Sequence, residues 1–529
     1  RGRCLAQRAR LPVLRSSGPP ARSGRELRRG RNMAVMLDPW GGSVPLPEGI
    51  TLRTPGLVGE VDVTAVPAAA QRDAGAPAAA WLNEALEEHD GRSRFVLQVR
   101  DTATAPVEEA MAVRTKYGEP AIVATVPAPP PDHVQVALVT DESGVTTWHV
   151  PEAPSAPVAV RDPGVQTFVL RGTVPPAQGN VEQRGFGGWL AKKIVRFVVV
   201  PLAKRAGAEV GELLVRRWER DNRPHRLRSF TPRDFTSRGE ELAPSVFSTW
   251  SGKRALLFVH GTSDSARTSF GRLDRGLVED LHRQYDGRVF AFDHPTLATA
   301  PRDNVAWFLA QLPPEVDLQL DVVCSSRGGL VSRLLSEQLD HPDLRAALGS
   351  RRLSVDRLVF SATPNAGTRL VDTEHLTTYV DAFTNLLTLV PDNPVTDAAA
   401  AIISLVADLA TGVADQLVGL QSMRPNGDLL RELNQQPRST KRYYALTSDF
   451  EPQHAGFRKW ATDVLVDQVF GEPNDLVVPT AGTYRDVGGG PFPIAPERRH
   501  EFTRSEGISH GGFFANNTVH QRLRTWLEV

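Results

Sequence analysis

From about residue 245 to the end of the chain, short apolar segments alternate with segments of helical periodicity. Strands covered on both faces appear as nearly continuous apolar runs, and their alternation with helices is typical of a parallel sheet between two helical layers. The pattern therefore predicts one α/β domain over residues 245–529. The expected strands are Ala255–Val259, Val289–Phe292, Leu318–Cys324, Leu358–Ala362, Arg442–Thr447 and Leu465–Phe470.

Residues 33–180 show a different pattern, in which short apolar runs are separated by Pro, Gly and Asp clusters. Two of these runs, joined through Asp141–Gly144, read as a β-hairpin. Several short strands at this spacing predict a small sandwich or barrel, in which we find no catalytic residues and whose partner stays unknown. The expected strands are Phe95–Val99, Ala121–Val126, Val134–Thr140, Val145–Val150 and Gln166–Gly172.

Residues 181–244 are expected to link the two domains. Within them, Trp189–Leu214 reads as a basic amphipathic helix with a kink at Pro201. Its uninterrupted apolar stretch is far shorter than the roughly 20 residues that a membrane span requires. We expect a linker helix with one packed face, and the alternative is a peripheral contact of 189–214 with an anionic membrane surface.

Charge and cysteine content exclude several classes of protein. The 529 residues hold 61 Lys and Arg against 61 Asp and Glu, which argues against a nucleic-acid partner. The 2 cysteines, Cys4 and Cys324, are too few for a disulfide framework or a cysteine zinc site. The bias toward Arg over Lys suggests a GC-rich bacterial genome, and the lack of a secretory signal favours a cytoplasmic protein.

The Arg-rich residues 1–32 stand apart from this balance. They are expected to be disordered and to be upstream sequence rather than native protein, with a transit peptide or a basic arm as the alternatives.

A strand-to-helix turn at 322–329 is the strongest local motif. Leu318–Val323 reads as a buried strand, Cys324-Ser325-Ser326-Arg327-Gly328-Gly329 follows, and a helical period begins at Leu330. A serine at the apex of such a turn is held in a strained backbone conformation that exposes a nucleophilic hydroxyl. Small residues two positions away on each side let strand and helix pass closely. Ser326 is therefore the candidate nucleophile, although Cys324 stands where Gly is usual.

A second motif, His260-Gly261-Thr262, ends an earlier buried strand. Gly261 allows the backbone to turn so that an amide faces the nucleophile. A tetrahedral oxyanion needs two such preorganised donors, and we assign them to the backbone N–H groups of Thr262 and Arg327. His260 is expected to brace this loop.

A hydroxyl nucleophile requires a base, and the base requires an orienting carboxylate. In this type of fold the chain order is serine, acid, histidine. The acid is expected just after a late strand, which selects Asp475 after Leu465–Phe470 and leaves Asp449 as the second candidate.

The base is expected on a loop before the C-terminal helix, Thr518–Leu527. His510, within Gly507-Ile508-Ser509-His510-Gly511-Gly512, fits this position. His500 lies in a charged run and His520 inside the helical pattern, so we expect both to be solvated.

Residues 250–529 resemble the α/β-hydrolase superfamily, and within it bacterial lipases and esterases related to the glycosylphosphatidylinositol-deacylase group. The resemblance implies a doubly wound, mostly parallel sheet with Ser326, Asp475 and His510 as a catalytic triad, and it implies no metal or organic cofactor. The motifs that carry it are VHGT at 259, CSSRGG at 324, ATPNAGT at 362, the run from Gly419 to Asn434, NDLVVP at 474 and SHGG at 509.

An insertion at about 370–435 is expected to form a helical cap. Two helical stretches, Thr377–Leu389 and Asp397–Leu420, flank a Pro-rich break. A cap over the site would shelter an apolar acyl chain and exclude water. We therefore expect a serine hydrolase acting on a carboxylic ester or a lipid-like small molecule. The alternatives are an acyltransferase with the same triad and a catalytically silent interaction protein.

Overall fold

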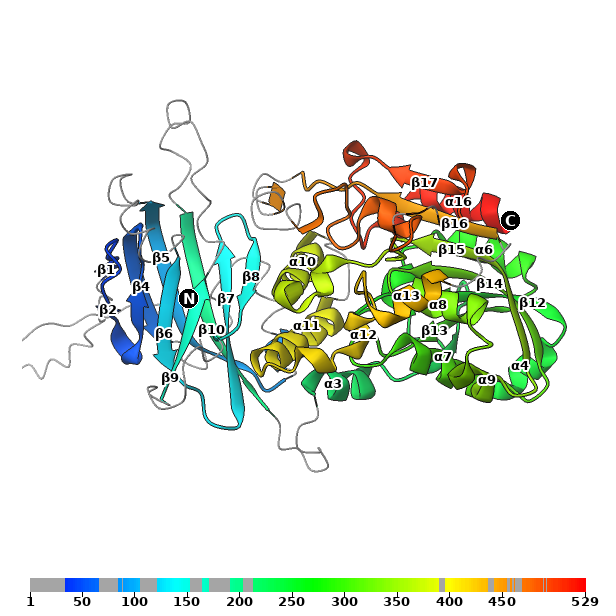
Figure 1. Ribbon diagram of the computed structural model, residues 1–529, viewed down its shortest axis with the longest axis horizontal. Helices are drawn as coiled ribbons and strands as arrows, with labels where there is room; N and C mark the ends of the chain where they lie inside the picture. Colours follow the sequence, from blue (N-terminus) through cyan, green and yellow to red (C-terminus); the bar gives the residue numbers. More distant parts are fainter. Residues whose placement is uncertain are drawn as a thin grey trace, which may run out of the picture. The chain divides into compact units, whose positions relative to one another are not determined.

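The structure is a computed structural model (Figure 1). The extension expected at 1–32 lies outside the described residues. These are 34–65, 84–87, 89–104, 121–152, 164–170, 191–202, 213–389, 395–435, 442–453, 457–458, 461, 469–488, 490 and 492–529.

A seven-stranded sheet forms the centre of the C-terminal domain. Its first strand is antiparallel to its neighbour, and all the others run parallel. The predicted mostly parallel sheet is therefore confirmed. The strands, in spatial order, are β11 (Arg226–Ser229), β13 (Val289–Asp293), β12 (Lys253–Val259), β14 (Asp317–Ser325), β15 (Arg352–Ser361), β16 (Arg442–Ser448) and β17 (Arg499–Phe502).

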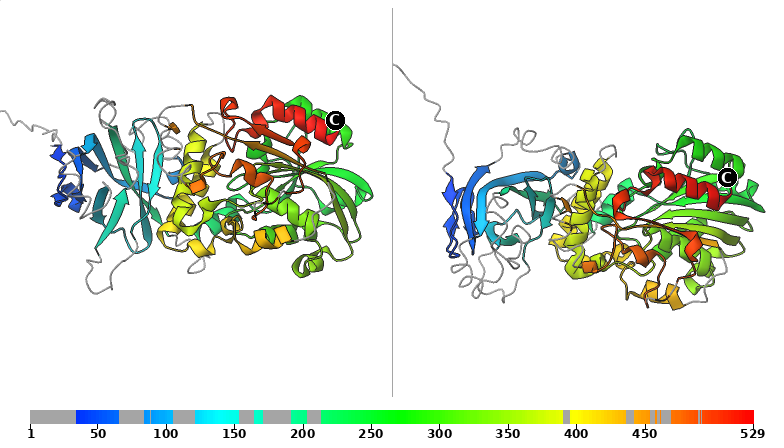
Figure 2. Two further views of the ribbon diagram at one scale, coloured as in Figure 1. Left: turned by 45° about the horizontal axis from the view of Figure 1, so that its top comes forward. Right: turned by 90° about the horizontal axis from the view of Figure 1, so that it is seen from above.

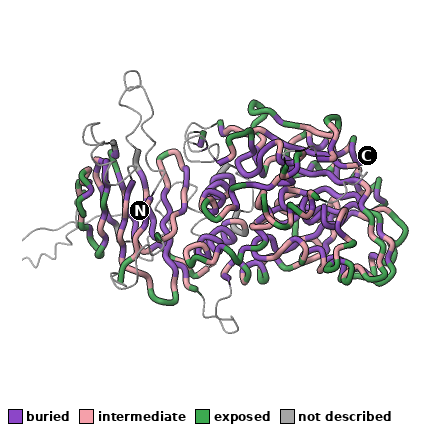
Figure 3. Tube along the Cα trace, viewed as in Figure 1, coloured by how far each residue is buried: buried purple, intermediate pink, exposed green. Residues whose placement is uncertain are grey.

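Helices cover both faces of this sheet (Figure 2). Side chains alternate along a strand, so Leu257 of β12 faces one helical layer and Leu256 and Phe258 face the other. The sheet is consequently buried on both sides (Figure 3). One layer contains α5 (Ala266–Phe270), α6 (Arg275–Gln284) and α16 (Asn517–Leu527). The other contains α4 (Pro244–Thr249), α7 (Pro301–Gln311), α8 (Gly328–Glu337) and α9 (Pro342–Leu348).

The expected cap lies between β15 and β16. Its long helices are α10 (Leu376–Leu389) and α11 (Val395–Ala410), and the shorter α12 (Val418–Gln421) and α13 (Asp428–Gln435) follow. The apolar residues of α11 are buried because this helix packs against α10, α3 (Leu214–Asn222) and strand β7 (His133–Asp141). Within the described part of the chain, no helix is both long and apolar enough to cross a membrane.

The N-terminal domain consists of two antiparallel sheets that share a hydrophobic core, as in a sandwich. The hairpin predicted at 134–150 is present as β7 and β8. The six-stranded sheet has the order β1 (Val35–Met36), β4 (Leu57–Ala65), β5 (Arg92–Thr104), β10 (Ala191–Pro201), β7 (His133–Asp141) and β8 (Thr146–His149). The four-stranded sheet has the order β2 (Val44–Pro45), β3 (Thr51–Arg53), β6 (Ile122–Pro127) and β9 (Val165–Leu170).

The amphipathic helix predicted at 189–214 is wrong over Ala191–Pro201, and residues 189–190 and 203–212 lie outside the described residues. Ala191–Pro201 is strand β10, which pairs with β5 and β7 inside the six-stranded sheet. Its β-branched residues favour a strand, and Arg196 is buried and donates to Ser93 Oγ at 2.7 Å. Lys193 and Arg196, two of the basic residues on which the predicted membrane contact of 189–214 depended, are buried. The seven-stranded sheet also begins earlier than residue 245, at β11.

The strand predicted at Leu465–Phe470 is also not supported. Val469 and Phe470 are helical, and the four residues before them lie outside the described part of the chain. The strand that precedes the candidate acid in the sheet is β16, which ends at Ser448.

The edge strand β8 is covered by the cap helix α10. Thr146 N–H donates to Asn385 Oδ1 at 3.0 Å, and Asn385 Nδ2 donates back to Thr146 O at 2.8 Å. Trp148 donates through its backbone N–H to Asp381 Oδ1 at 2.7 Å and through Nε1 to Thr384 Oγ1 at 3.0 Å. Side chains of a helix thus satisfy the open backbone edge of the sheet. We call these contacts the β8–α10 seam.

Candidate functional site

Ser326 occupies the apex of the turn between β14 and α8, as the sequence predicts. Its φ is +50°, a left-handed conformation that is costly for a residue with a side chain and that clusters at active sites. The Ser326 N–H donates to Ser361 O at 2.8 Å, which holds the turn against β15. Ser325, in contrast, is the last residue of β14. The backbone therefore selects Ser326 as the strained serine of the pair.

Small residues allow this turn to pack closely. A Cβ at Gly261 would lie 2.8 Å from Ser326 Cβ, so the glycine loop directly contacts the serine. A Cβ at Gly328 would lie 2.4 Å from His260 O. Cys324 fits where Gly is usual, because its thiol is fully buried and donates to Val359 O at 3.3 Å. The departure from the usual motif is therefore accommodated inside the sheet.

The backbone amides of Thr262 and Arg327 flank this contact between loop and serine. Within the described residues, neither amide donates a hydrogen bond to another protein atom. The next amide along the first loop is fixed, since Ser263 N–H donates to Thr296 Oγ1 at 3.0 Å. Two free amides beside a strained serine can serve as donors to an anionic oxygen.

His260 braces the glycine loop. Its Nδ1 donates to Gly261 O at 2.8 Å, and its Nε2 accepts from the His294 N–H at 3.0 Å. The two rings stack with centroids 4.3 Å apart. Burial lowers the pKa of both imidazoles, so both are neutral at pH 7. A neutral His260 with both nitrogens engaged is a loop-positioning residue.

The side chain of Arg327 is fully buried, which the sequence did not indicate. Its Nε donates to Gly419 O at 2.9 Å and its Nη2 to Thr299 O, so it joins α8 to the cap. Burial lowers its pKa to about 10, and the nearby Glu219 carboxylate opposes that shift. Glu219 in turn accepts from the backbone of the loop after β13. Arg327 is consequently charged at neutral pH beside the candidate site.

His510 and Asp475 form a buried pair. His510 Nδ1 lies 2.8 Å from Asp475 Oδ2, and the two residues are 7% and 2% exposed. The other carboxylate oxygen, Oδ1, accepts from the amides of Val477 and Val478 at 3.0 and 2.7 Å. An ionised carboxylate only accepts, so His510 must carry its proton on Nδ1. His510 Nε2 is buried and makes no hydrogen bond with any described residue, so it is free to accept a proton.

The alternative acid and bases lie elsewhere. Asp449 follows β16 directly but pairs with Arg504 at 2.7 Å. His500 lies on β17 against Arg522. His520 is buried and bonded to Phe514 O at 2.9 Å, so the expectation that it is solvated is wrong. Among the described residues, none of the three forms a hydrogen bond, ion pair or ring contact with residues 322–329.

Cap residues cover the site, and no sequence motif identifies them. The Phe383 ring of α10 lies edge-on to His510, with centroids 6.0 Å apart. Met423 Sδ accepts from Thr262 Oγ1 at 3.9 Å. Ser326 is 4% exposed beneath these groups. Because Nε2 of His510 has no partner, Ser326 Oγ is not bonded to it here, which is common before substrate binds.

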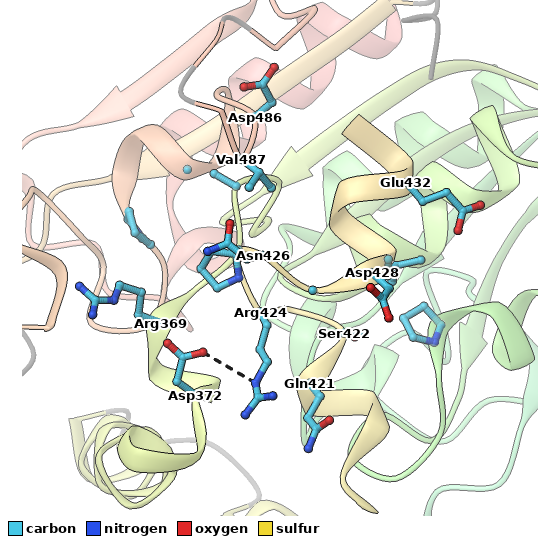
Figure 4. Close-up of a pocket in the computed structure, with 18 of the residues that line it drawn as sticks. Arg369, Asp372, Gln421, Ser422, Arg424, Asn426, Asp428, Glu432, Asp486 and Val487 are labelled. Atoms are coloured by element: carbon cyan, nitrogen blue, oxygen red, sulfur yellow. Dashed lines mark ion pairs between the residues drawn. The ribbon is translucent and has the colours of Figure 1, made fainter. Parts of the chain in front are cut away.

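A cavity of about 1150 Å³ lies beside the cap but does not include Ser326, Asp475 or His510 in its lining. Its walls mix acidic and basic side chains with apolar ones (Figure 4). One pair of them, Arg424 and Asp372, is joined at 3.7 Å. We therefore separate this cavity from the candidate catalytic site.

Comparison with solved structures gives several distant similarities. Lipase 1 from Pelosinus fermentans is 15% identical, with a TM-score of 0.33, 52% of this chain covered and 98% of that chain. Aspergillus fumigatus lipase B is 14% identical, with a TM-score of 0.28 and 51% of each chain covered. Homoserine O-acetyltransferase from Staphylococcus aureus is 14% identical, with a TM-score of 0.28, 53% of this chain covered and 86% of that chain. With TM-scores this low, none of these similarities supports a functional conclusion.

A search of curated proteins finds no match. Residues 222–528 match the model of a family described as a domain of unknown function, DUF7379. This match spans more than half of the chain and contains the strained serine, both flanking amides and the buried histidine–carboxylate pair. The chain belongs to the DUF7379 family.

Proposed function

We propose that this chain is a serine hydrolase that cleaves carboxylic esters, with Ser326 as nucleophile, His510 as base and Asp475 as the orienting acid. The observation that carries the proposal is the buried pair at 2.8 Å between His510 Nδ1 and Asp475 Oδ2. This contact fixes the tautomer in which Nε2 is unprotonated. His510 Nε2 is buried without a hydrogen-bond partner, which costs folding free energy. A role as catalytic base accounts for this cost, because the nitrogen is then available to the serine hydroxyl.

The proposed reaction has two stages. Ser326 Oγ attacks the acyl carbon while His510 Nε2 takes the hydroxyl proton, and collapse of the tetrahedral intermediate expels the alcohol with that proton. Water then attacks the acyl-enzyme with its proton passing to His510, and release of the carboxylic acid returns the proton to Ser326 Oγ. Asp475 stays ionised and stabilises the imidazolium in both stages.

The oxyanion would be held by the amides of Thr262 and Arg327. Both belong to turns that are fixed by other contacts, so little reorganisation is needed when charge develops. Gly261 keeps the first turn in contact with the serine, and no larger residue would fit there without displacing it.

The cap supports an apolar acyl group as the substrate. Phe383 and Met423 lie over the His510 and Thr262 sides of the site, and both are apolar. The resemblance to deacylases makes lipid esters the first compounds to screen. An acyltransferase would use the same acyl-enzyme with an alcohol acceptor in place of water.

Labelling with a fluorophosphonate probe tests the proposal. We expect the wild type and Ser325→Ala to be labelled and Ser326→Ala to remain unlabelled. Ser325 is the matched control because it is the adjacent serine, at the end of β14. Labelling of Ser326→Ala, or no reaction of the wild type with either the probe or short-chain esters, would refute the proposed mechanism.

Product analysis separates hydrolysis from transfer. The purified enzyme is incubated with an activated ester, with and without a primary alcohol. Free acid as the main product in both mixtures supports a hydrolase, and a new ester at the expense of acid identifies an acyltransferase.

A further inference from the structure

Tyr379 lies on the face of α10 that is directed toward the candidate site. Its ring packs against Phe383 with centroids 4.7 Å apart, and Phe383 in turn contacts His510. The side chain is 1% exposed. The Thr262 hydroxyl and the Arg327 charge both lie close enough to the phenol group to lower its pKa, against the larger effect of burial. Tyr379 therefore lies near both residues whose amides flank Ser326.

The Thr262 side chain lies close enough to the Tyr379 hydroxyl to affect its pKa, but the two groups do not meet in hydrogen-bonding geometry. The Tyr379 hydroxyl is buried and makes no hydrogen bond of ordinary geometry with a described residue. A buried hydroxyl without a partner costs free energy, and such groups in native structures call for an explanation. Burial also raises the pKa of Tyr379, so the phenol keeps its proton and remains a donor at any physiological pH.

We propose that the Tyr379 hydroxyl is a third hydrogen-bond donor to the oxyanion, supplied by the cap in addition to the two backbone amides. The inference rests on the proposed function, because it requires a tetrahedral intermediate on Ser326. It assigns a catalytic role to a cap residue that lies outside the predicted triad and oxyanion motifs. During the reaction the carbonyl oxygen of the substrate becomes negative, and this oxygen would accept the hydrogen bond of the phenol.

The surroundings of Tyr379 hold this donor in place. Two residues further along α10, Asp381 bonds to the backbone of β8, and Thr384 and Asn385 continue the β8–α10 seam. These contacts fix α10 from the side of the β-sandwich while Tyr379 and Phe383 face the site. A donor that is positioned before the charge develops stabilises it most effectively.

Replacing Tyr379 by Phe removes the hydroxyl and keeps the ring. Loss of one oxyanion donor lowers kcat on the order of 100-fold, and we expect this with KM nearly unchanged. We also expect weaker inhibition by an alkyl trifluoromethyl ketone, whose adduct with Ser326 carries an oxyanion. The melting temperature should stay the same or rise, because the lost hydroxyl has no partner in the resting protein.

Tyr443→Phe is the matched control. The Tyr443 hydroxyl is also buried but donates to Glu337 Oε1 at 2.7 Å and lies 3.1 Å from Ser336 Oγ. This variant should lose thermal stability and keep its kcat. The two Tyr-to-Phe variants should thus show opposite effects on stability and turnover, which a purely structural role of Tyr379 would not produce.

The outcomes are distinguishable from those of the proposed function. If the wild type hydrolyses esters and Tyr379→Phe keeps kcat within about twofold, the oxyanion role of Tyr379 is refuted while the triad stands. If Tyr379→Phe loses stability together with turnover, as a structural residue would, the inference is also refuted. If the wild type is inert toward both probe and esters, the proposed function fails and the inference fails with it. Tyr379→His carries a ring N–H donor that Tyr379→Phe lacks. Its kcat should therefore lie between those of Tyr379→Phe and the wild type.

Discussion

Replacing Asp475 by Asn tests the tautomer that the structure assigns to His510. Asp475 Oδ1 accepts two backbone amides, from Val477 and Val478, while Oδ2 faces His510 Nδ1. In the variant the amide oxygen must stay with the two backbone donors, because turning the NH₂ group toward them would oppose donor to donor. The NH₂ group therefore faces His510 and forces Nδ1 to become an acceptor. The proton of the neutral imidazole moves to Nε2, where it blocks base catalysis.

The expected loss is large in turnover and small in stability. A triad histidine held in the wrong tautomer lowers kcat by roughly 10⁴-fold, which corresponds to about 5.4 kcal/mol in the activation free energy. The two backbone bonds to Oδ1 remain, so the free energy of unfolding should change little. The variant is also nearly isosteric, so the cap packing is preserved.

The assay is steady-state hydrolysis of a p-nitrophenyl ester together with the rate of fluorophosphonate labelling. Both should fall in Asp475→Asn, with an unchanged melting temperature. Asp449→Asn serves as the control, because its carboxylate pairs with the exposed Arg504 instead of a histidine. Full activity of Asp475→Asn, or loss of activity only in Asp449→Asn, would refute the assignment of the acid.

Three further predictions concern stability and reactivity. Gly328→Ala places a Cβ 2.4 Å from His260 O and should lower the free energy of unfolding by about 1–3 kcal/mol in urea denaturation. Gly511→Ala, with open space around it, should change that free energy by less than about 0.5 kcal/mol, and equal effects would contradict the packing argument. Burial raises the pKa of Asp408 from 3.8 to about 7. The folded state thus holds this proton more tightly than the unfolded chain, and the free energy of unfolding should decrease as pH rises from about 4 to about 7, a decrease that Asp408→Asn should reduce. Burial raises the pKa of Cys324 to about 12, so iodoacetamide at pH 8 should modify Cys324 only in urea, and modification of the folded protein would contradict its burial.

The sequence was sufficient for the parts of the fold that local patterns encode. The strand, the small residues and the helix around Ser326 are contiguous, so their turn could be predicted before its φ was known. His510 and Asp475 lie 35 residues apart, yet each stands in a loop with few competing candidates. Chain order and loop position selected them, although the strand expected before Asp475 is not supported, and the structure places the two side chains in contact.

Strand β10 was not predictable in the same way. Lys193 and Arg196 interrupt its apolar residues, and this spacing is also typical of an amphipathic helix with a charged face. Both are buried, and the partner of Arg196, Ser93, is about 100 residues away in the sequence. A local pattern cannot distinguish a solvated charge from one with such a distant partner, and the β-branched residues after Arg196 were the better signal.

Tyr379 could not be found from the sequence for a related reason. It lies within an apolar helical period, where an aromatic residue normally packs in the core. Only the combination of burial, a hydroxyl without a partner and proximity to Thr262 and Arg327 distinguishes it. Each of these properties arises from tertiary packing.

The β8–α10 seam has a consequence for how this protein can be divided. The family domain begins at residue 222, whereas the structural unit that contains it begins at Ala34. A recombinant fragment starting at 222 would expose Trp148's former partners, Asp381 and Thr384, on a helix that also forms the roof of the site. The region that matches the family model is therefore smaller than the compact structural unit, and a fragment that begins at residue 222 is expected to be less stable than the chain from Ala34 because α10 loses its hydrogen bonds to β8.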